Sequence, residues 1–189
     1  MNIIVNLSSY QIDTMKHDLL DVNLWVSNII TSLVNKGKVN LFQDYLPKII
    51  GSVESMPATD GDFIDCVLAR DDYVNNSVEY TPAEVDLEAS LSIAIDLSDI
   101  ESVYIYYSVA NLNKYIDDII TSKVEACSKR MIAEYYPILM NDQDVEIIPA
   151  NKIELISCIK SHKDYMNRSD RELSSEDNKP CDIKYLDLV

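Results

Sequence analysis

Glycine and histidine are scarce in this chain of 189 residues, which contains three glycines and two histidines. No segment matches G-x-x-x-x-G-K-S/T or G-x-G-x-x-G, the glycine-rich loops that hold nucleotide phosphates, so neither kind of nucleotide site is expected. Neither histidine, His17 or His162, has the spacing to other ligands that zinc sites show. The four cysteines form no C-x-x-C pair, and we expect them to be reduced, buried thiols. The sequence therefore predicts no metal site and no cofactor.

Basic residues and long apolar runs are also lacking. Lys and Arg number 16 against 32 Asp and Glu, which gives a net charge of -16. Free nucleic acid is not expected as a partner, because binding it depends on neutralising phosphates with basic side chains. No apolar run approaches the roughly 20 residues of a membrane span, and residues 1–6 have neither the basic stretch nor the cleavage site of a signal peptide. We therefore expect a soluble protein that binds neither nucleic acid nor membrane.

An internal repeat is the strongest pattern that is present. Shifting the sequence by 90 residues places Ile3–Ile50 on Ile93–Met140, and Ile29–Ser32 then meets the identical run Ile119–Ser122. After two inserted residues the match resumes at a shift of 92. Further identical pairs are Leu7/Leu97, Asn23/Asn113, Tyr45/Tyr135, Pro47/Pro137, Cys66/Cys158 and Tyr73/Tyr165. A chance alignment would not keep prolines and aromatics in order over about 75 positions, so the sequence predicts one module present twice.

Each copy is predicted to begin with a strand and a short helix. Alternating β-branched residues predict strands over 2–7 and 92–97. Ser8-x-x-Gln11 follows the first strand and Ser98-x-x-Glu101 follows the second. Both are capping boxes, in which the two side chains satisfy free backbone N–H groups at a helix start.

A long helix and a third helix are predicted to follow. Asp21 and Asn111 can cap the long helix, and Pro47 or Pro137 should lie at or just beyond its end, because an interior proline costs roughly 3 kcal/mol. The caps predicted for the third helices are Thr59-x-x-Asp62 and Asn151-x-x-Glu154.

These patterns predict a mainly α fold, in which two tandem homologous helical modules, each opened by a short β-strand, pack as a pseudo-dimer with a small strand pairing. A module of about 75 residues buries little apolar surface alone, so association would complete its core. The predicted parts are copy one at 1–77, a linker at 78–90, copy two at 91–169, and a polar tail at 170–189 that ends in a segment with strand character.

Copy two carries the candidate partner-binding residues. It has Tyr104, Tyr106 and Tyr107 where copy one has no tyrosine, and Lys129 and Arg130 where copy one has an uncharged pair. Tyrosine and arginine are common at interface hot spots, so copy two is expected to carry more of a partner surface than copy one. The alternative is that these tyrosines belong to the helix core and that their hydroxyls reach water.

The tail adds two further candidates, Ile183 and Tyr185, in an alternating segment that could add to the edge of a sheet. No catalytic group is expected. The most strictly kept motif, Asp72-Tyr73-x-Asn75, reads as a helix stop, with a ligand-binding carboxylate–phenol pair as the alternative. Cys158 and His162 would suggest an enzyme only if they shared a deep pocket.

The order of motifs carries a resemblance. Asp21-x-x-x-Trp25-Val26 and Asn111-x-x-x-Tyr115-Ile116 open the long helices, and copy two continues with Lys129-Arg130-Met131, Glu134-Tyr135-Tyr136-Pro137 and Ile148-Pro149-Ala150. This pattern resembles small, mostly uncharacterised proteins of tailed bacteriophages that are built on a single such module. The resemblance covers both copies, whereas the doubling of the module and the tail are departures from it.

What the resemblance implies is a phage origin and a virion-associated role. The expected function is that of a structural or assembly protein of the head, connector or tail, which contacts other phage structural proteins or further copies of itself. It would be found in the host cytoplasm during assembly and then in the virion. The alternative is an acidic phage inhibitor that binds a basic host defence or DNA-binding protein by charge mimicry. The acids are spread without a long run, which favours solubility over mimicry as their role.

Overall fold

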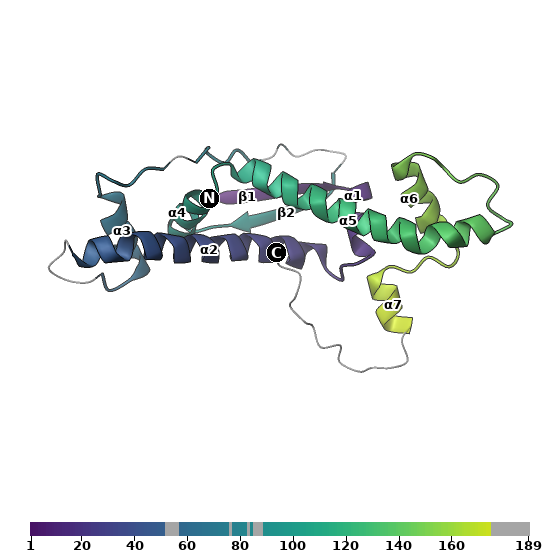
Figure 1. The fold of residues 1–189 in the computed structure, drawn as a ribbon, viewed down its shortest axis with the longest axis horizontal. Coiled ribbons are helices and arrows are strands. Elements are labelled where there is room, and N and C mark those ends of the chain that lie inside the picture. The colour runs from purple at the N-terminus through teal and green to yellow at the C-terminus, as the bar shows by residue number, and fades with distance from the viewer. Residues whose placement is uncertain (52–56, 76, 83, 85–88, 175–189) are drawn as a thin grey trace.

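The computed structural model describes residues 1–51, 57–75, 77–82, 84 and 89–174 (Figure 1). In chain order the elements are β1 (Asn2–Ser8), α1 (Ser9–Lys16), α2 (Val22–Ile50), α3 (Asp60–Leu68), β2 (Ala89–Asp96), α4 (Asp99–Ser108), α5 (Leu112–Asn141), α6 (Lys152–Ser161) and α7 (Arg168–Ser174). The protein is therefore mainly helical with one small antiparallel sheet, which confirms this part of the prediction.

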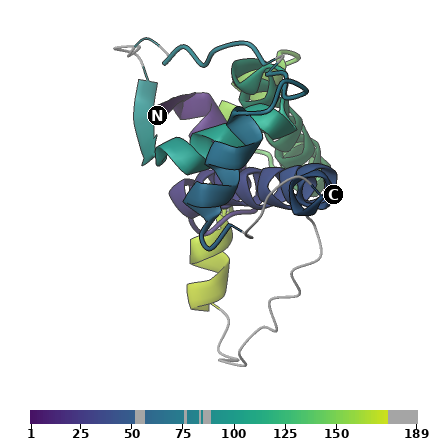
Figure 2. The same cartoon turned by 90° about the vertical axis from the view of Figure 1, so that its left-hand side faces the viewer.

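The two strands pair through the middle of the molecule. Ile4 of β1 lies opposite Ala94 of β2, and these two positions are equivalent at the shift of 90. Ile3, Val5 and Leu7 are buried on one face of β1, as the period of two predicts. Viewed along the long axis, α2 and α5 lie on the same side of the sheet (Figure 2), and the buried strand residues pack against both long helices.

The helices extend the molecule in two directions from the sheet. The long helices run in opposite senses, so that α2 leads to α3 at one end and α5 leads to α6 at the other (Figure 1). α4 packs on α2 and α1 packs on α5. The short helix of each half therefore packs on the long helix of the other half, and neither half encloses its own core.

Each end has an apolar cluster formed by the last turns of a long helix and the helix that follows it. The first-end cluster contains Leu41, Tyr45, Ile49, Phe63, Ile64 and Val67. The second-end cluster contains Met131, Tyr135, Leu139, Leu155, Ile156 and Ile159, which are the same positions 90 or 92 residues later. Tyr104 of α4 is buried in the first cluster and Tyr10 of α1 packs against the second, which again joins the two halves.

The predicted helix starts are confirmed with one difference. Capping boxes form at Ser8, Thr59 and Ser98, and the side chains of Asp21 and Asn111 accept hydrogen bonds from the first turns of α2 and α5. The difference is at the start of α6. There the side chain of Asn151 accepts a hydrogen bond from the backbone of Ile153 at 2.9 Å and does not close a box with Glu154.

The prediction that the long helices end at Pro47 and Pro137 is wrong. α2 continues to Ile50 and α5 continues to Asn141. A proline loses the hydrogen bond of its own amide and its ring crowds the carbonyl four residues before it, but each proline lies close to its helix end. The turns beyond the prolines bury Ile49 and Leu139 in the end clusters, which offsets the lost bond.

Described residues of the predicted linker and of the predicted polar tail make contacts with the rest of the molecule. Tyr80, within the predicted linker, is buried, and its hydroxyl bonds both the amide and the carbonyl of Ile4 at 2.8 and 3.1 Å. Tyr80 therefore covers the free edge of β1 at Ile4. At the start of the tail, residues 168–174 form α7, whose Arg171 donates a hydrogen bond to the carbonyl of His17.

Candidate functional site

The three tyrosines of α4 lie partly or fully inside the molecule. Tyr104 is 2% exposed and packs in the first-end cluster, and burial raises the pKa of its phenol to about 12. Tyr106 is half-buried and accepts a hydrogen bond from the backbone of Tyr80 at 3.1 Å. Tyr107 is half-buried and donates a hydrogen bond to the carboxylate of Asp44. The prediction that Tyr104 binds a partner is therefore wrong, because this residue belongs to the core.

The predicted basic candidates lie on the surface of α5. Lys129 is exposed, and Arg130 is exposed with its guanidinium 3.0 Å from the carboxylate of Asp18. Arg130 therefore joins α5 to the turn after α1. The remaining candidates, Ile183 and Tyr185, lie outside the described residues.

A side chain contacts a carboxylate at matching positions of the two halves. This side chain is a tyrosine in one half and a histidine in the other. At the first end, Tyr107 at the end of α4 donates a hydrogen bond to Asp44 of α2. At the second end, Nε2 of His17 lies 3.2 Å from a carboxylate oxygen of Glu134 of α5. Two tyrosines stand beside each pair, Tyr45 and Tyr73 at the first end and Tyr135 and Tyr165 at the second. The sequence repeat aligns these positions, but the alignment alone did not indicate that they touch.

His17 is buried beneath charged groups from several segments. It is 1% exposed, and burial is the main cause that lowers its pKa below the usual value. Arg171 lowers the pKa of His17 further, whereas Asp18 and Glu134 act in the opposite direction. The imidazole is therefore neutral at pH 7, so it does not repel the charged guanidinium of Arg171 beside it.

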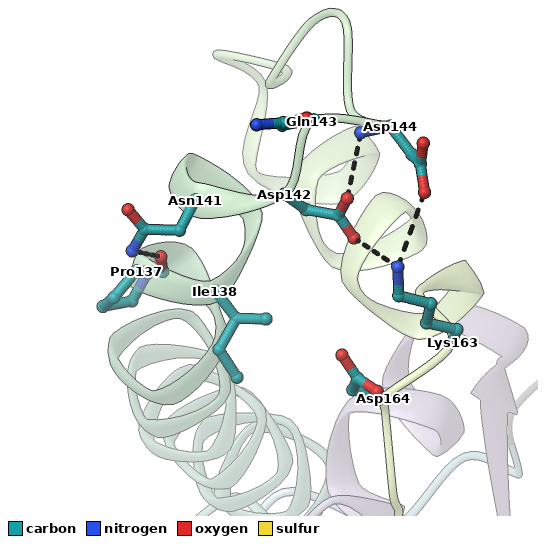
Figure 3. Close-up of a pocket in the computed structure, with 8 residues that line it drawn as sticks. All are labelled: Pro137, Ile138, Asn141, Asp142, Gln143, Asp144, Lys163 and Asp164. Carbon is teal, nitrogen blue, oxygen red and sulfur yellow. Dashed lines mark hydrogen bonds and ion pairs between the residues drawn. The ribbon is translucent and has the colours of Figure 1, made fainter.

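A shallow hollow of about 670 Å³ opens beyond the end of α5 (Figure 3). The carboxylate of Asp142 occupies its wall and accepts hydrogen bonds from the amide of Asp144 at 2.9 Å, from His162 at 2.8 Å and from Lys163 at 3.2 Å. These bonds, the one from the Asp144 amide foremost, lower the pKa of Asp142 to about 2. The network fixes the turn between α5 and α6 and presents no activated nucleophile.

Cys158 and His162 line an adjoining hollow of about 390 Å³. Nε2 of His162 is bound to Asp142, and its Nδ1 accepts a hydrogen bond from the amide of Asp164 at 3.2 Å. Both ring nitrogens are therefore engaged away from the thiol. The arrangement is that of a structural histidine, because a base must reach the group that it activates.

Metal chemistry finds no support among the residues that the structure describes. Within them, no group of three or more His, Cys, Asp or Glu side chains is placed to hold a metal ion. No helix of the described part is long and apolar enough to cross a membrane.

No known protein family, curated protein or solved structure matches this chain. The surface itself is therefore the basis for a functional assignment. Its clearest feature surrounds the hollows at the second end.

Large apolar side chains are exposed on the last turns of α5, on the loop after it and on the first turn of α6. They are Tyr136, Ile138, Met140, Ile147 and Ile153. Ile147 is 81% exposed and Met140 is 62% exposed. At the matching positions of the first half, Lys48 stands for Ile138 and Gly61 for Ile153, whereas Ile50, which matches Met140, is exposed as well. The sequence signal for this apolar end is the presence of large apolar residues outside the buried face of each helix, which an internal repeat does not reveal.

Proposed function

We propose that the protein is a structural or assembly component of a tailed-phage particle, in its head, connector or tail, and that it acts by protein–protein contact. The observation that carries the proposal is the apolar end of α5 and α6. An acidic chain with a net charge of -16 gains solubility from its charge, so the large apolar side chains exposed around the end of α5 and the start of α6 are costly unless a partner covers them. The partner is taken to be another structural protein of the particle.

A binding role fits the chemistry of the surface better than catalysis does. His162 and Asp142 are tied into a turn, and His17 is buried and neutral. An enzyme site needs a nucleophile and a base in mutual reach. At the two hollows of the second end, Asp142 and His162 hold the turn by accepting hydrogen bonds from the backbone amides of Asp144 and Asp164.

Mass spectrometry of purified particles tests this function. A structural component should be recovered in a fixed ratio to the major capsid or tail protein and should survive washing at high salt. Its absence from particles that otherwise contain the complete set of structural proteins would end the proposal.

The net charge favours one second candidate, an inhibitor of a basic host defence or DNA-binding protein that acts by charge mimicry. Such a complex would weaken steeply as the salt concentration rises, because its charges are screened over about 10 Å at 0.1 M salt. An assembly contact through apolar side chains would be far less sensitive to salt. A salt titration of the isolated complex therefore separates the two candidates.

We also infer that the chain arose by tandem duplication of one module and that the halves pack as a pseudo-dimer. What supports this inference is the match of helix bounds, end clusters and tyrosine contacts at shifts of 90 and 92. Tyr45 bonds the carbonyl of Asp72 at 3.2 Å, and Tyr135 bonds the carbonyl of Asp164 at 3.5 Å. Residues 1–78 alone should then fold only by self-association, and a stable monomer of that segment would contradict the inference.

A further inference from the structure

A hollow of about 420 Å³ lies at the first end, between α2, the end of α4 and the chain that follows α3. Its lining includes the Asp44 carboxylate and the tyrosines Tyr73, Tyr106 and Tyr107, together with several amide side chains. No Lys, Arg or His is among the described residues that line it. The hollow therefore offers negative charge and aromatic rings without a cation of its own.

The matching place at the second end shows what such a hollow can hold. Asp44, Tyr73 and Tyr107 correspond to Glu134, Tyr165 and His17. There the guanidinium of Arg171 lies against the matching groups. It contacts the Glu134 carboxylate at 3.4 Å and donates a hydrogen bond to the backbone carbonyl of His17.

We propose that the hollow around Asp44, Tyr73 and Tyr107 binds an arginine side chain of a protein partner, as its counterpart holds Arg171. Asp44 would accept a charge-assisted hydrogen bond, as Glu134 does. The carbonyl of Tyr107 lies in the last turn of α4, where helical carbonyls have no donor within the helix. A planar guanidinium suits a carboxylate, a carbonyl and flat rings better than an ammonium group does.

None of the described residues places an arginine in this hollow. The position that matches Arg171 is Glu79, whose charge has the wrong sign, and the next residue, Tyr80, is bonded to the edge of β1. Three described cations near this end are already paired. Lys38 bonds Asp60, and Lys48 and Arg70 both bond Asp72.

The inference rests on the proposed function in one respect, namely that the occupant belongs to a protein. It is tested on the full chain with two short peptides, acetyl-Gly-Arg-Gly-amide and the same peptide with citrulline, which has the same shape without the charge. Backbone amide shifts are followed by NMR. The arginine peptide should shift Asn75, Ser108 and Val109, all of which line the hollow, in a saturable way, and the citrulline peptide should not.

Two variants with the same change of charge complete the test. Asp44→Asn keeps an oxygen that can accept the Tyr107 hydrogen bond, so the fold should persist, but binding of the arginine peptide should weaken about tenfold or more. Asp65→Asn, exposed on α3 outside the hollow, should bind as the unmodified chain does. The inference would be overturned by equal shifts with the citrulline peptide, by shifts spread over the acidic surface, or by the lack of any saturable shift. Unchanged binding of the arginine peptide by Asp44→Asn would also overturn it. Presence of the protein in particles together with such a result would leave the proposed function standing.

Discussion

Gly37 of α2 lies directly against the backbone carbonyl of Tyr104, so closely that a β-carbon at position 37 would overlap the carbonyl oxygen and the hydroxyl of Ser108. This contact seats α4 of one half on α2 of the other. The matching position in α5 holds the buried Cys127, so α5 accommodates a side chain where α2 cannot.

Gly37→Ala should therefore destabilise the protein, although alanine favours helices. The gain in helix propensity of about 1 kcal/mol is opposed by a clash with backbone, and the shifts that such overpacking forces typically cost about 1–3 kcal/mol. We expect a net fall in the free energy of unfolding, measured by urea titration. Gly51→Ala is the control, because a β-carbon there meets its nearest atom at 3.6 Å. An equal or higher stability for Gly37→Ala would show that the two helices are not in this contact.

Tyr80→Phe should loosen the edge of β1. The hydroxyl is bonded to both the amide and the carbonyl of Ile4, and leaving such groups without a partner costs about 1–3 kcal/mol. The variant should unfold at a lower urea concentration, and the Ile4 amide should exchange its hydrogen faster. Tyr136→Phe, at a position 42% exposed, should change neither quantity. Unchanged exchange at Ile4 in Tyr80→Phe would contradict the bonding described.

His17 should make stability depend on pH. Its folded pKa is lowered below the usual 6.5, chiefly by burial, so the unfolded chain binds a proton more readily than the folded one. The stability from this group is therefore complete above about pH 6.5 and is lost as pH falls from there through the lowered folded pKa. His17→Gln should show a smaller loss of unfolding free energy between pH 7.5 and pH 5 than the unmodified chain. Identical losses would mean that His17 does not titrate as described.

Thiol labelling should distinguish the described cysteines. Cys127 is buried, and its pKa is raised to about 12, first by that burial, so it carries almost no thiolate at neutral pH. Cys66 and Cys158 are partly exposed. Peptide mapping after brief treatment with iodoacetamide at pH 8 should find Cys66 and Cys158 modified well before Cys127. Rapid labelling of Cys127 in the folded protein would mean that α5 is more open than described.

The sequence predicted the local structure well because local structure depends on neighbouring residues. The strand alternation around Ile4 and the capping pairs at Ser8 and Ser98 need no knowledge of the rest of the fold. Pro47 does not end α2, because the burial of Ile49, a tertiary contribution, offsets the cost of the proline. Propensity alone contains no such information.

The candidate site was harder to predict because it depends on which helix covers which. Periodicity shows that a helix has a buried face, but not that α4 covers α2 of the other half. Tyr104 therefore looked like a contact residue and lies in the core. The pairing of Tyr107 with Asp44 joins residues that are 63 positions apart, and no local pattern links them.

The proposal that this chain joins a particle through its apolar end is tested most directly by incorporation of variants into particles. Met140→Asp with Ile147→Asp places charge on that end at positions 62% and 81% exposed, where folding should be unaffected. Ile50→Asp is the matched control, at the equivalent of Met140 on the other end and 54% exposed. Quantitative mass spectrometry of purified particles should find the unmodified chain and Ile50→Asp in the same fixed ratio to the major structural protein, and the double variant depleted about tenfold or more, as the loss of a well-packed apolar contact implies. Equal incorporation of all three chains, or absence of the unmodified chain, would contradict the account.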